Sequence, residues 1–276
     1  MADYRIGFKW WALIIAVVFV ISEFVCVACV PERPVACDEK PGKISDMFKA
    51  LFKNDQAMTV VVSIILVYTS LNICGNLVLY FFRFDVGNEG AYSIFAAVAF
   101  AAQVLVMMVI PLLRKRFSKS QLFISGFIIQ IAGFAVILIM AFAKLYTPQS
   151  WYILCLPGIL IYLGYGMLNV IMTIFLSDSV DYGEVMNGTR EESVIFSMQT
   201  FTVKLASGVA VFLAGLVVDW IHLDTAAAVQ TQDTLDALRM WMTIPSVILL
   251  IVGIFVFKRF YKLDDTRMEE IKSKLN

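Results

Sequence analysis

The sequence predicts an all-α polytopic membrane protein with about seven transmembrane helices. Hydrophobic residues make up 60% of its 276 positions, whereas soluble domains average about 45–50%. Asp, Glu, Lys and Arg together make up only 16%, against about 25% in soluble domains. Seven stretches are apolar over roughly 20 residues, the length that a helix needs to cross a bilayer. These observations exclude an ordinary soluble domain.

The predicted spans are stretches of nearly continuous apolar sequence. The first is followed by no small-residue cleavage site, so we interpret it as a span and not as a signal peptide. Aromatic residues such as Trp10, Trp151 and Trp241 stand at the span ends, as expected for a membrane–water interface. In chain order the spans are 10–30, 58–82, 91–113, 121–143, 151–176, 194–218 and 240–258.

The connecting segments differ in the sign of their charge, and this difference predicts the orientation. Segment 114–119 (RKRFSK) has four basic residues and no acid, and the last span ends in KRFYK. Segment 219–239, on the opposite side, has four Asp and one Arg. Because cytoplasmic loops are enriched in Lys and Arg, we predict that the basic segments are cytoplasmic. The C-terminus is then inside the cell, and seven spans leave the N-terminus outside.

The longest connection, 31–57, is predicted to be a cytoplasmic middle loop with an amphipathic helix. Three Pro residues are followed by KISDMFKALFK, which suits a helix lying on the membrane surface. One helix, a long loop and six further helices fit the later part of a two-half bundle, cut before the last helix of its first half. The apolar face of the amphipathic helix would hold Ile44, Met47, Phe48, Leu51 and Phe52.

Charge and motifs argue against other functional classes. The 22 basic and 22 acidic residues balance, so there is no nucleic-acid-binding footprint. Cys26 and Cys29 form a CxxC near Cys37, but the only His, His222, is distant, and small apolar helix residues are the better interpretation than a metal site. No Ser/His/Asp or Cys/His set, metal-ligand spacing or phosphate-binding loop supports an enzyme. We expect neither a catalytic site nor a bound cofactor.

Lys204 lies near the middle of the sixth span and is a candidate cavity residue. A Lys at the bilayer centre costs about 2.5–3.5 kcal/mol even on the most lenient scale, so it normally faces a partner or a water-filled cavity. Its neighbours at helical spacing are polar or small, while the rest of the helix is apolar. An ion pair that only holds helices together is the structural alternative. The neighbours are Ser193, Ser197, Thr200, Ser207, Gly208, Val211 and Gly215.

Amide side chains in two other spans are candidates for the same cavity. In the second span Tyr68, Asn72 and Asn76 recur every four residues and so share one helical face. Such amides either bond between helices or contact a polar solute, and their spacing does not distinguish the two. Asn169, in GYGMLNVIMT of the fifth span, is a weaker signal.

The acidic bend SDSVDYGEVMNGTREES at 177–193 lies between the fifth and sixth spans, on the predicted cytoplasmic side. Asp178, Asp181 and Glu184 are three residues apart and share a face if the fifth helix continues through them. NG at 187–188 is a strong turn signal. Acids need partners on a side where basic charge is expected, and Arg114, Lys115 and Arg116 in the preceding cytoplasmic loop are candidates. Arg190 and Glu192 of the bend belong to the same predicted set of ion pairs.

Residues 178–208, DSVDYGEVMNGTREESVIFSMQTFTVKLASG, resemble the D-x-V-D/E-Y-G-E…R-x-E-S…S-x-Q-T-x-x-x-K segment of the glycoside–pentoside–hexuronide:cation symporters. The charged bend and Lys204, which follows it, are the specific part of the resemblance. The other helices match mostly in their pattern of apolar residues. The resemblance covers essentially the whole chain. Further similar segments are FKALFKNDQ (48–56), LNICGNLVLYFFRFDVG (71–87) and FYKLDDTRMEEIKSKL (260–275).

The resemblance implies a major-facilitator fold of two six-helix halves in a bacterial cytoplasmic membrane. Residues 1–30 would be the last helix of the N-terminal half, 58–260 the six-helix C-terminal bundle, and 261–276 a cytoplasmic tail. It also implies symport of a sugar or glycoside with Na⁺, Li⁺ or H⁺. The substrate would bind between the two halves, near the membrane midplane. The family's main sugar- and cation-binding acids lie on first-half helices, so we expect a missing N-terminal half in cis or in trans.

The resemblance also implies roles for single residues. The Lys matching Lys204 approaches the cation and sugar region, and residues matching Thr200 and Asn72 lie near the same cavity. Those matching Asp178, Asp181 and Arg190 belong to a charged network that helps to close the cytoplasmic side. Melibiose permease, a member of the family, has a Trp where this chain has Asn169, so galactoside specificity is not carried over.

The expected function is therefore cation-coupled sugar symport by the C-terminal half of a transporter, with the charged bend acting as a gate. The alternative from another class is a non-transporting membrane subunit or assembly partner. In that case Lys204 and the bend would pair with a neighbouring protein for structural reasons only.

Overall fold

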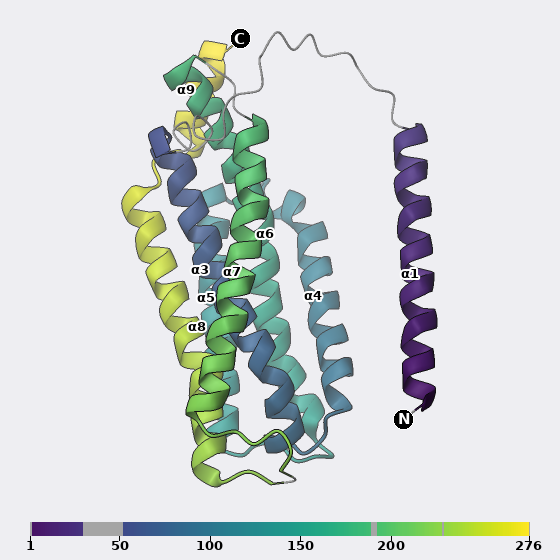
Figure 1. The fold of residues 1–276 in the computed structure, drawn as a ribbon. Coiled ribbons are helices and arrows are strands. Elements are labelled where there is room, and N and C mark those ends of the chain that lie inside the picture. The colour runs from purple at the N-terminus through teal and green to yellow at the C-terminus, as the bar shows by residue number, and fades with distance from the viewer. Residues whose placement is uncertain (1, 30–51, 189–191, 228, 276) are drawn as a thin grey trace. The chain divides into compact units, whose positions relative to one another are not determined.

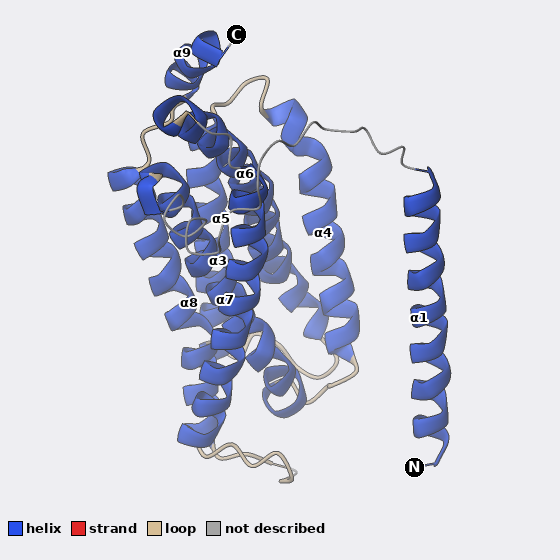
Figure 2. Ribbon diagram, turned by 45° about the horizontal axis from the view of Figure 1, so that its top comes forward, coloured by secondary structure: helices blue, strands red, loops and turns tan. Residues whose placement is uncertain are grey.

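The computed structural model describes residues 2–29, 52–188, 192–227 and 229–275. Over these residues the chain forms helices joined by turns, with no strand (Figure 2). Seven of its helical segments are long and apolar enough to cross a membrane. The predicted all-α fold class and the seven spans are confirmed.

The chain divides into two units, Met1–Lys43 and Ile44–Asn276. The first contains α1 (Ala2–Cys29), which corresponds to the predicted first span. The second contains the other six spans and a short C-terminal helix (Figure 1). Its elements are α3 (Asp55–Tyr80), the π-helical η1 (Phe81–Asp85), α4 (Ala91–Leu113), α5 (Lys119–Phe142), the 3₁₀ turn η2 (Trp151–Leu154), α6 (Cys155–Asn187), α7 (Glu192–Trp220), α8 (Gln232–Phe260) and α9 (Asp265–Leu275).

Local sequence signals determine where several helices begin and end. Asn54 caps α3, because its side-chain oxygen accepts a hydrogen bond from the Ala57 N–H at 2.9 Å. Ser118 and Gln121 form a capping box at the start of α5. α6 ends at Gly188, whose left-handed φ of +74° favours glycine, so the NG turn is where the sequence predicts it.

α6 is much longer than its predicted span. Its 33 residues extend about 50 Å, whereas the hydrocarbon core of a bilayer is about 30 Å thick. The helix therefore continues beyond the apolar stretch that ends near residue 176 and carries the first acids of the bend with it. Asp178, Asp181 and Glu184 consequently follow one another along a single helix.

In the second unit, α3 packs against α7 and α8, and α6 packs against α4 and α5. A cluster of aromatic side chains joins α5, α6 and α8: Phe123, Phe127, Phe175 and Phe257 are all buried. Ring centroids in this cluster are 4.5–5.2 Å apart. This packing holds the three helices together where α6 and α8 approach their C-termini. We call that end of the bundle the α9 end, and the opposite end, where α8 begins, the Arg239 end.

The short helix α9 packs on the extension of α6 (Figure 1). Leu263, Met268 and Ile271 are buried there, and Tyr182 and Val185 of α6 pack against them. The predicted tail is thus helical and docked over Asp265–Leu275. The predicted amphipathic helix of the middle loop cannot be compared, because residues 44–51 lie outside the described ranges; Phe52 is exposed.

Close packing of α5 against α6 depends on Gly164. A Cβ at this position would lie 2.5 Å from the carbonyl oxygen of Gly126 and 2.6 Å from the backbone nitrogen of Gln130. Both are backbone atoms, so the helices would have to separate. We therefore expect Gly164→Ala to lower the free energy of unfolding by about 1–3 kcal/mol, as overpacking typically does.

Thermal unfolding of the purified protein in detergent measures this effect. Gly75→Ala in α3 is the matched control, because a Cβ there meets no described neighbouring atom within 4 Å. It should leave the unfolding temperature unchanged or raise it, since Ala is the better helix former. Equal unfolding temperatures for the two variants would contradict the close helix contact.

Candidate functional site

Lys204 is exposed on α7, on the side turned away from the packed face of that helix. Ala206, Ala210 and Ala214 are buried on the packed face. The Lys204 ammonium makes no hydrogen bond or ion pair with any residue that the structure describes. The polar stripe predicted from the sequence is therefore a free surface of this bundle. Its exposed members are Ser193, Ser197, Thr200, Lys204, Gly208, Val211 and Gly215, with Ser207 half-buried.

The two amides of α3 bond within their own helix. The Asn72 Nδ2 donates to the Tyr68 carbonyl oxygen and the Asn76 Nδ2 to the Asn72 carbonyl oxygen, each at 2.7 Å. Neither side chain bridges to another described helix, so the interpretation as interhelical glue receives no support. Both side chains are half-buried and keep their Oδ1 acceptors without a described partner.

Asn169 joins α6 to α3. Its Nδ2 donates to the Tyr68 hydroxyl at 2.6 Å, and the Tyr68 and Tyr165 rings meet edge to face with centroids 5.5 Å apart. The structure thus places Asn169 beside the polar face of α3. Sequence reasoning missed a second polar link, in which the Gln199 Nε2 of α7 donates to the Thr173 hydroxyl of α6 at 3.4 Å.

The polar faces of α3 and α7 adjoin each other towards the Arg239 end. A pocket of about 330 Å³ lies between the two helices, with Asn76 and Tyr80 on one side and Val211, Gly215 and Asp219 on the other. Asn76 belongs to the polar face of α3, and Val211 and Gly215 belong to the Lys204 stripe. Of the predicted cavity residues on these two helices, Asn76 lines this pocket, together with members of the Lys204 stripe.

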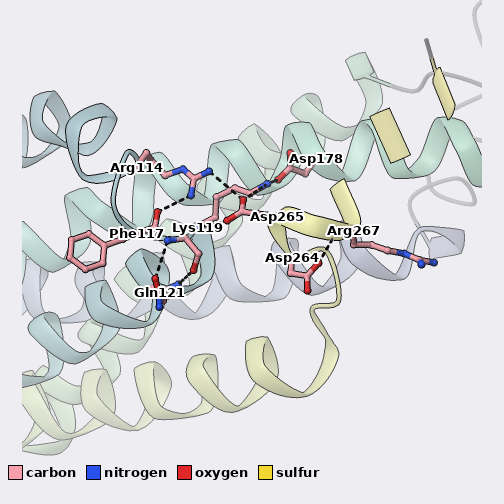
Figure 3. Close-up of polar contacts among 9 residues, drawn as sticks. Arg114, Phe117, Lys119, Gln121, Asp178, Asp264, Asp265 and Arg267 are labelled. Atoms are coloured by element: carbon pink, nitrogen blue, oxygen red, sulfur yellow. Dashed lines mark hydrogen bonds and ion pairs between the residues drawn. The ribbon is translucent and has the colours of Figure 1, made fainter. Parts of the chain in front are cut away.

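At the α9 end, the Lys119 ammonium forms a buried ion pair with Asp178 (Figure 3). Both side chains are only 7% exposed. Asp265 of α9 completes the cluster, with its Oδ1 lying 3.3 Å from the Arg114 guanidinium and 3.5 Å from the Lys119 ammonium. We call these four residues the α9-end cluster. It ties the α4–α5 turn to α6 and α9.

The ion-pair partner of Asp178 is not one of the three predicted loop residues Arg114, Lys115 and Arg116. Asp178 pairs with Lys119, whereas Arg114 reaches the cluster through Asp265. Lys119, as the first residue of α5, sits next to Asp178 because the capping box starts α5 at that point. Asp181 and Glu184 are half-buried further along α6, and Glu192 is the exposed first residue of α7. Arg190 lies outside the described residues.

The neighbouring basic residues keep the Asp265 carboxylate charged. Burial alone would raise the pKa of Asp265, but the hydrogen bond and charge of Arg114, together with the charge of Lys119, lower it below its ordinary value. Stability that comes from a depressed carboxylate pKa is present above the ordinary value near 3.8 and is lost only as the pH falls through the lower folded value. Asp265 is therefore ionised throughout the physiological range.

A second charged cluster at the Arg239 end was not predicted. Asp85, at the end of η1, accepts two hydrogen bonds from the Arg239 guanidinium of α8, at 2.8 and 2.5 Å, and both side chains are only 3% exposed. Tyr146 donates to Asp85 at 2.6 Å, and Arg239 also donates to Asp236 at 2.6 Å. We call these four residues the Arg239 cluster. The available sequence signal was a single Arg in an otherwise acidic segment.

Burial raises the pKa of the Tyr146 phenol, and its hydrogen bond to Asp85 raises it further. The phenol is therefore a permanent hydrogen-bond donor to a carboxylate that is also held by Arg239. Asp85, Arg239 and Tyr146, the buried members of this cluster, connect η1, α8 and the α5–α6 connection as one hydrogen-bonded assembly. It has the character of a structural clamp.

The sequence model of one protein family, described as "MFS/sugar transport protein", matches residues 3–265. The chain is 24% identical over 274 residues to the uncharacterized symporter YjmB of Bacillus subtilis, covering 99% of this chain and 58% of that protein. It is 25% identical over 261 residues to an isoprimeverose transporter of Lactiplantibacillus pentosus (94% and 52%) and 23% identical over 276 residues to a raffinose carrier protein of Pediococcus pentosaceus (98% and 42%). The chain spans about half the length of these relatives.

Proposed function

Because the chain belongs to the MFS/sugar transport protein family, we propose that it is the C-terminal part of a secondary transporter that moves a sugar or glycoside together with Na⁺, Li⁺ or H⁺. The names of its relatives, which include a raffinose carrier and an isoprimeverose transporter, support a sugar as the substrate class. The proposed location is the cytoplasmic membrane of a bacterium, with the α9 end on the cytoplasmic side.

The observation that carries this proposal is the exposed Lys204 within a polar stripe of a membrane helix. A charged side chain at this depth normally faces a partner or a water-filled cavity. We expect the partner to be a carboxylate of the N-terminal half, supplied in cis or in trans. The cavity between the halves would then be lined by Lys204, Thr200, Asn72, Asn76 and Asn169.

In this mechanism the ammonium of Lys204 holds the acids of the facing half in position while the substrate and the coupling cation bind beside them. Binding of the cation then changes the charge that Lys204 faces. In this way the binding of the cation is coupled to the binding of the sugar. Rocking of the two halves exposes the cavity to each side of the membrane in turn. The amides contribute hydrogen-bond acceptors for sugar hydroxyl groups.

Uptake by the organism itself tests the proposal. Cells with the coding region intact are compared with cells that lack it, using radiolabelled raffinose, lactose and isoprimeverose with Na⁺, Li⁺ or a pH gradient. We expect cation-stimulated accumulation of at least one sugar, and its loss in the deletion. Identical uptake in both strains under every condition would favour the non-transporting membrane subunit instead.

The α9-end cluster supports a further part of the proposal, a cytoplasmic gate. Removing one partner of a buried ion pair leaves an uncompensated charge and typically costs about 3–5 kcal/mol, whereas removing both costs much less. We expect the double variant Lys119→Gln, Asp178→Asn to insert normally but to change the rate of sugar uptake several-fold, because the closed cytoplasmic side loses its ion pair.

The control for the gate is an exposed ion pair on the same helix end. Arg267 and Glu270 of α9 pair at 3.2 Å, with side chains 62% and 58% exposed. Such surface pairs contribute little, so Arg267→Gln, Glu270→Gln should leave uptake unchanged. If the Lys119, Asp178 double variant also transports at the unchanged rate, the pair has a purely structural role.

A further inference from the structure

The pocket between α3 and α7 differs chemically from two larger pockets in the same bundle. Those pockets, of about 490 and 560 Å³, have no charged residue in their linings. The α3–α7 pocket, of about 330 Å³, is lined by Asp219, Asn76 and Tyr80 together with small or β-branched apolar residues of α7. Its size is at the lower end of the range of about 300–1,000 Å³ that is usual for small-molecule sites.

The polar groups of this pocket are not used by the fold. The Asp219 carboxylate and the Tyr80 hydroxyl have no hydrogen bond or ion pair among the described residues. The Asn76 Nδ2 is bonded to the Asn72 carbonyl oxygen, which leaves its Oδ1 as an acceptor. The pocket therefore offers unpartnered hydrogen-bonding groups. The carboxylate and the amide oxygen are acceptors, and the phenol is both an acceptor and a donor.

The apolar part of the lining complements these groups. Val211, Ala214 and Val218 form an apolar wall on α7, and Tyr80 adds a half-buried ring on α3. The pocket is open at Gly215, where a Cβ would meet no described neighbouring atom within 4 Å. A neutral polyhydroxylated molecule, with several hydroxyl donors and C–H faces, matches both parts of this lining.

The pocket lies on the path from the Arg239 end to the proposed cavity. Along α7, Gly215 is about 16 Å from Lys204 at 1.5 Å per residue, towards the Arg239 end. Asn76 is one helical turn beyond Asn72 in the same direction. The pocket thus lies away from Lys204 itself, shares Asn76 with the proposed cavity, and is continuous with the polar faces of both helices.

We infer that this pocket is an entry subsite, in which a sugar binds through Asp219, Asn76 and Tyr80 before it moves to the cavity around Lys204. The inference rests on the proposed function, because that proposal places the Arg239 end outside the cell and so makes this pocket the point of entry. Occupation of the subsite itself requires neither a coupling cation nor movement of the helices. Binding at the pocket can therefore be measured without transport.

Protection of a single cysteine from labelling tests the inference. Gly215→Cys introduces a thiol into the open pocket, and the full chain is produced in right-side-out membrane vesicles at constant Na⁺. A membrane-impermeant sulfonated maleimide labels the thiol from outside, and peptide mass analysis reads the label at position 215 separately from the native cysteines. We expect raffinose, lactose or isoprimeverose to slow this labelling.

Two further variants make the test specific. Val229→Cys, at an 83% exposed position outside the pocket, should be labelled at the same rate with and without sugar. Adding Asp219→Asn to Gly215→Cys should raise the sugar concentration for half-protection at least about tenfold, because charge-assisted hydrogen bonds are roughly twice as strong as neutral ones.

Each outcome decides the inference. Protection at position 215 that is weakened by Asp219→Asn supports it. The absence of protection by all three sugars, equal protection at position 229, or protection that Asp219→Asn leaves unchanged would overturn it. Sugar uptake, measured in parallel in cells of the organism itself, which supply the N-terminal half, separates the two proposals. Uptake without protection overturns the subsite alone, and protection without uptake overturns the transport function while the subsite remains.

Discussion

Replacing Arg239 with Met should destabilise the protein by about 3–5 kcal/mol, the largest stability change that we expect from a single substitution. The substitution leaves the Asp85 carboxylate buried beside Tyr146 without its bidentate partner, and both members of the pair are only 3% exposed. Thermal unfolding in detergent, together with the amount of protein in the membrane, measures the effect.

A double variant separates the buried charge from other losses. Arg239→Met combined with Asp85→Leu removes both charges, so it should recover most of the stability that Arg239→Met loses. Arg83→Met is the control, because Arg83 and Glu89 pair at 3.8 Å with side chains 43% and 61% exposed, and we expect a change of about 1 kcal/mol or less. If the double variant is no more stable than Arg239→Met, an uncompensated charge is not the cause.

The second large effect should follow from replacing Lys204 with Ala. We expect cation-stimulated sugar accumulation to fall at least about tenfold, because an interaction with a charged group contributes roughly 1.5–3 kcal/mol. Insertion and stability should be unchanged, since the side chain is exposed and contacts no described partner within this bundle. Accumulation of labelled sugar, normalised to the amount of inserted protein, is the measurement.

Two variants control for the helix and for the charge. Leu205→Ala removes a neighbouring side chain that is 47% exposed and lies outside the polar stripe, and it should leave accumulation intact. Lys204→Arg keeps the positive charge and should retain part of the activity. Normal accumulation by inserted Lys204→Ala would exclude Lys204 from the coupled transport that we propose.

The spans and the polar stripe could be predicted because they depend on local patterns. An apolar run of about 20 residues and a helical repeat are visible in any window of the sequence. The stripe on α7 proved to be exposed because small residues such as Ala206 and Ala210 occupy the opposite face and pack inward. The NG turn also ends α6 where its backbone preference indicates.

The partners of buried charges could not be predicted in the same way. Asp85 and Arg239 are 154 residues apart, and Lys119 and Asp178 are 59 apart, so their pairing depends on helix packing that no local pattern specifies. Charge counting suggested Arg114, Lys115 or Arg116 for the acids of the bend, because all were expected on the same side of the membrane. The capping box at Ser118 places Lys119 closer. The pocket between α3 and α7 likewise forms only where the faces of two helices meet. Neither helix indicates it by its own sequence pattern.

The π-helical segment Phe81–Asp85 directly follows α3 and changes the helical phase at the end of the span Asp55–Asp85. Here the Val86 N–H donates to the Phe81 carbonyl oxygen, a spacing of five residues, which delays the rotation of the chain by about one residue, or roughly 100°. One continuous helix can therefore show its amide face to the α7 side and then turn Asp85 towards α8. The extra residue thus gives the amide-bearing part of this span and its Asp85 end separate helical registers, so that neither fixes the direction in which the other faces.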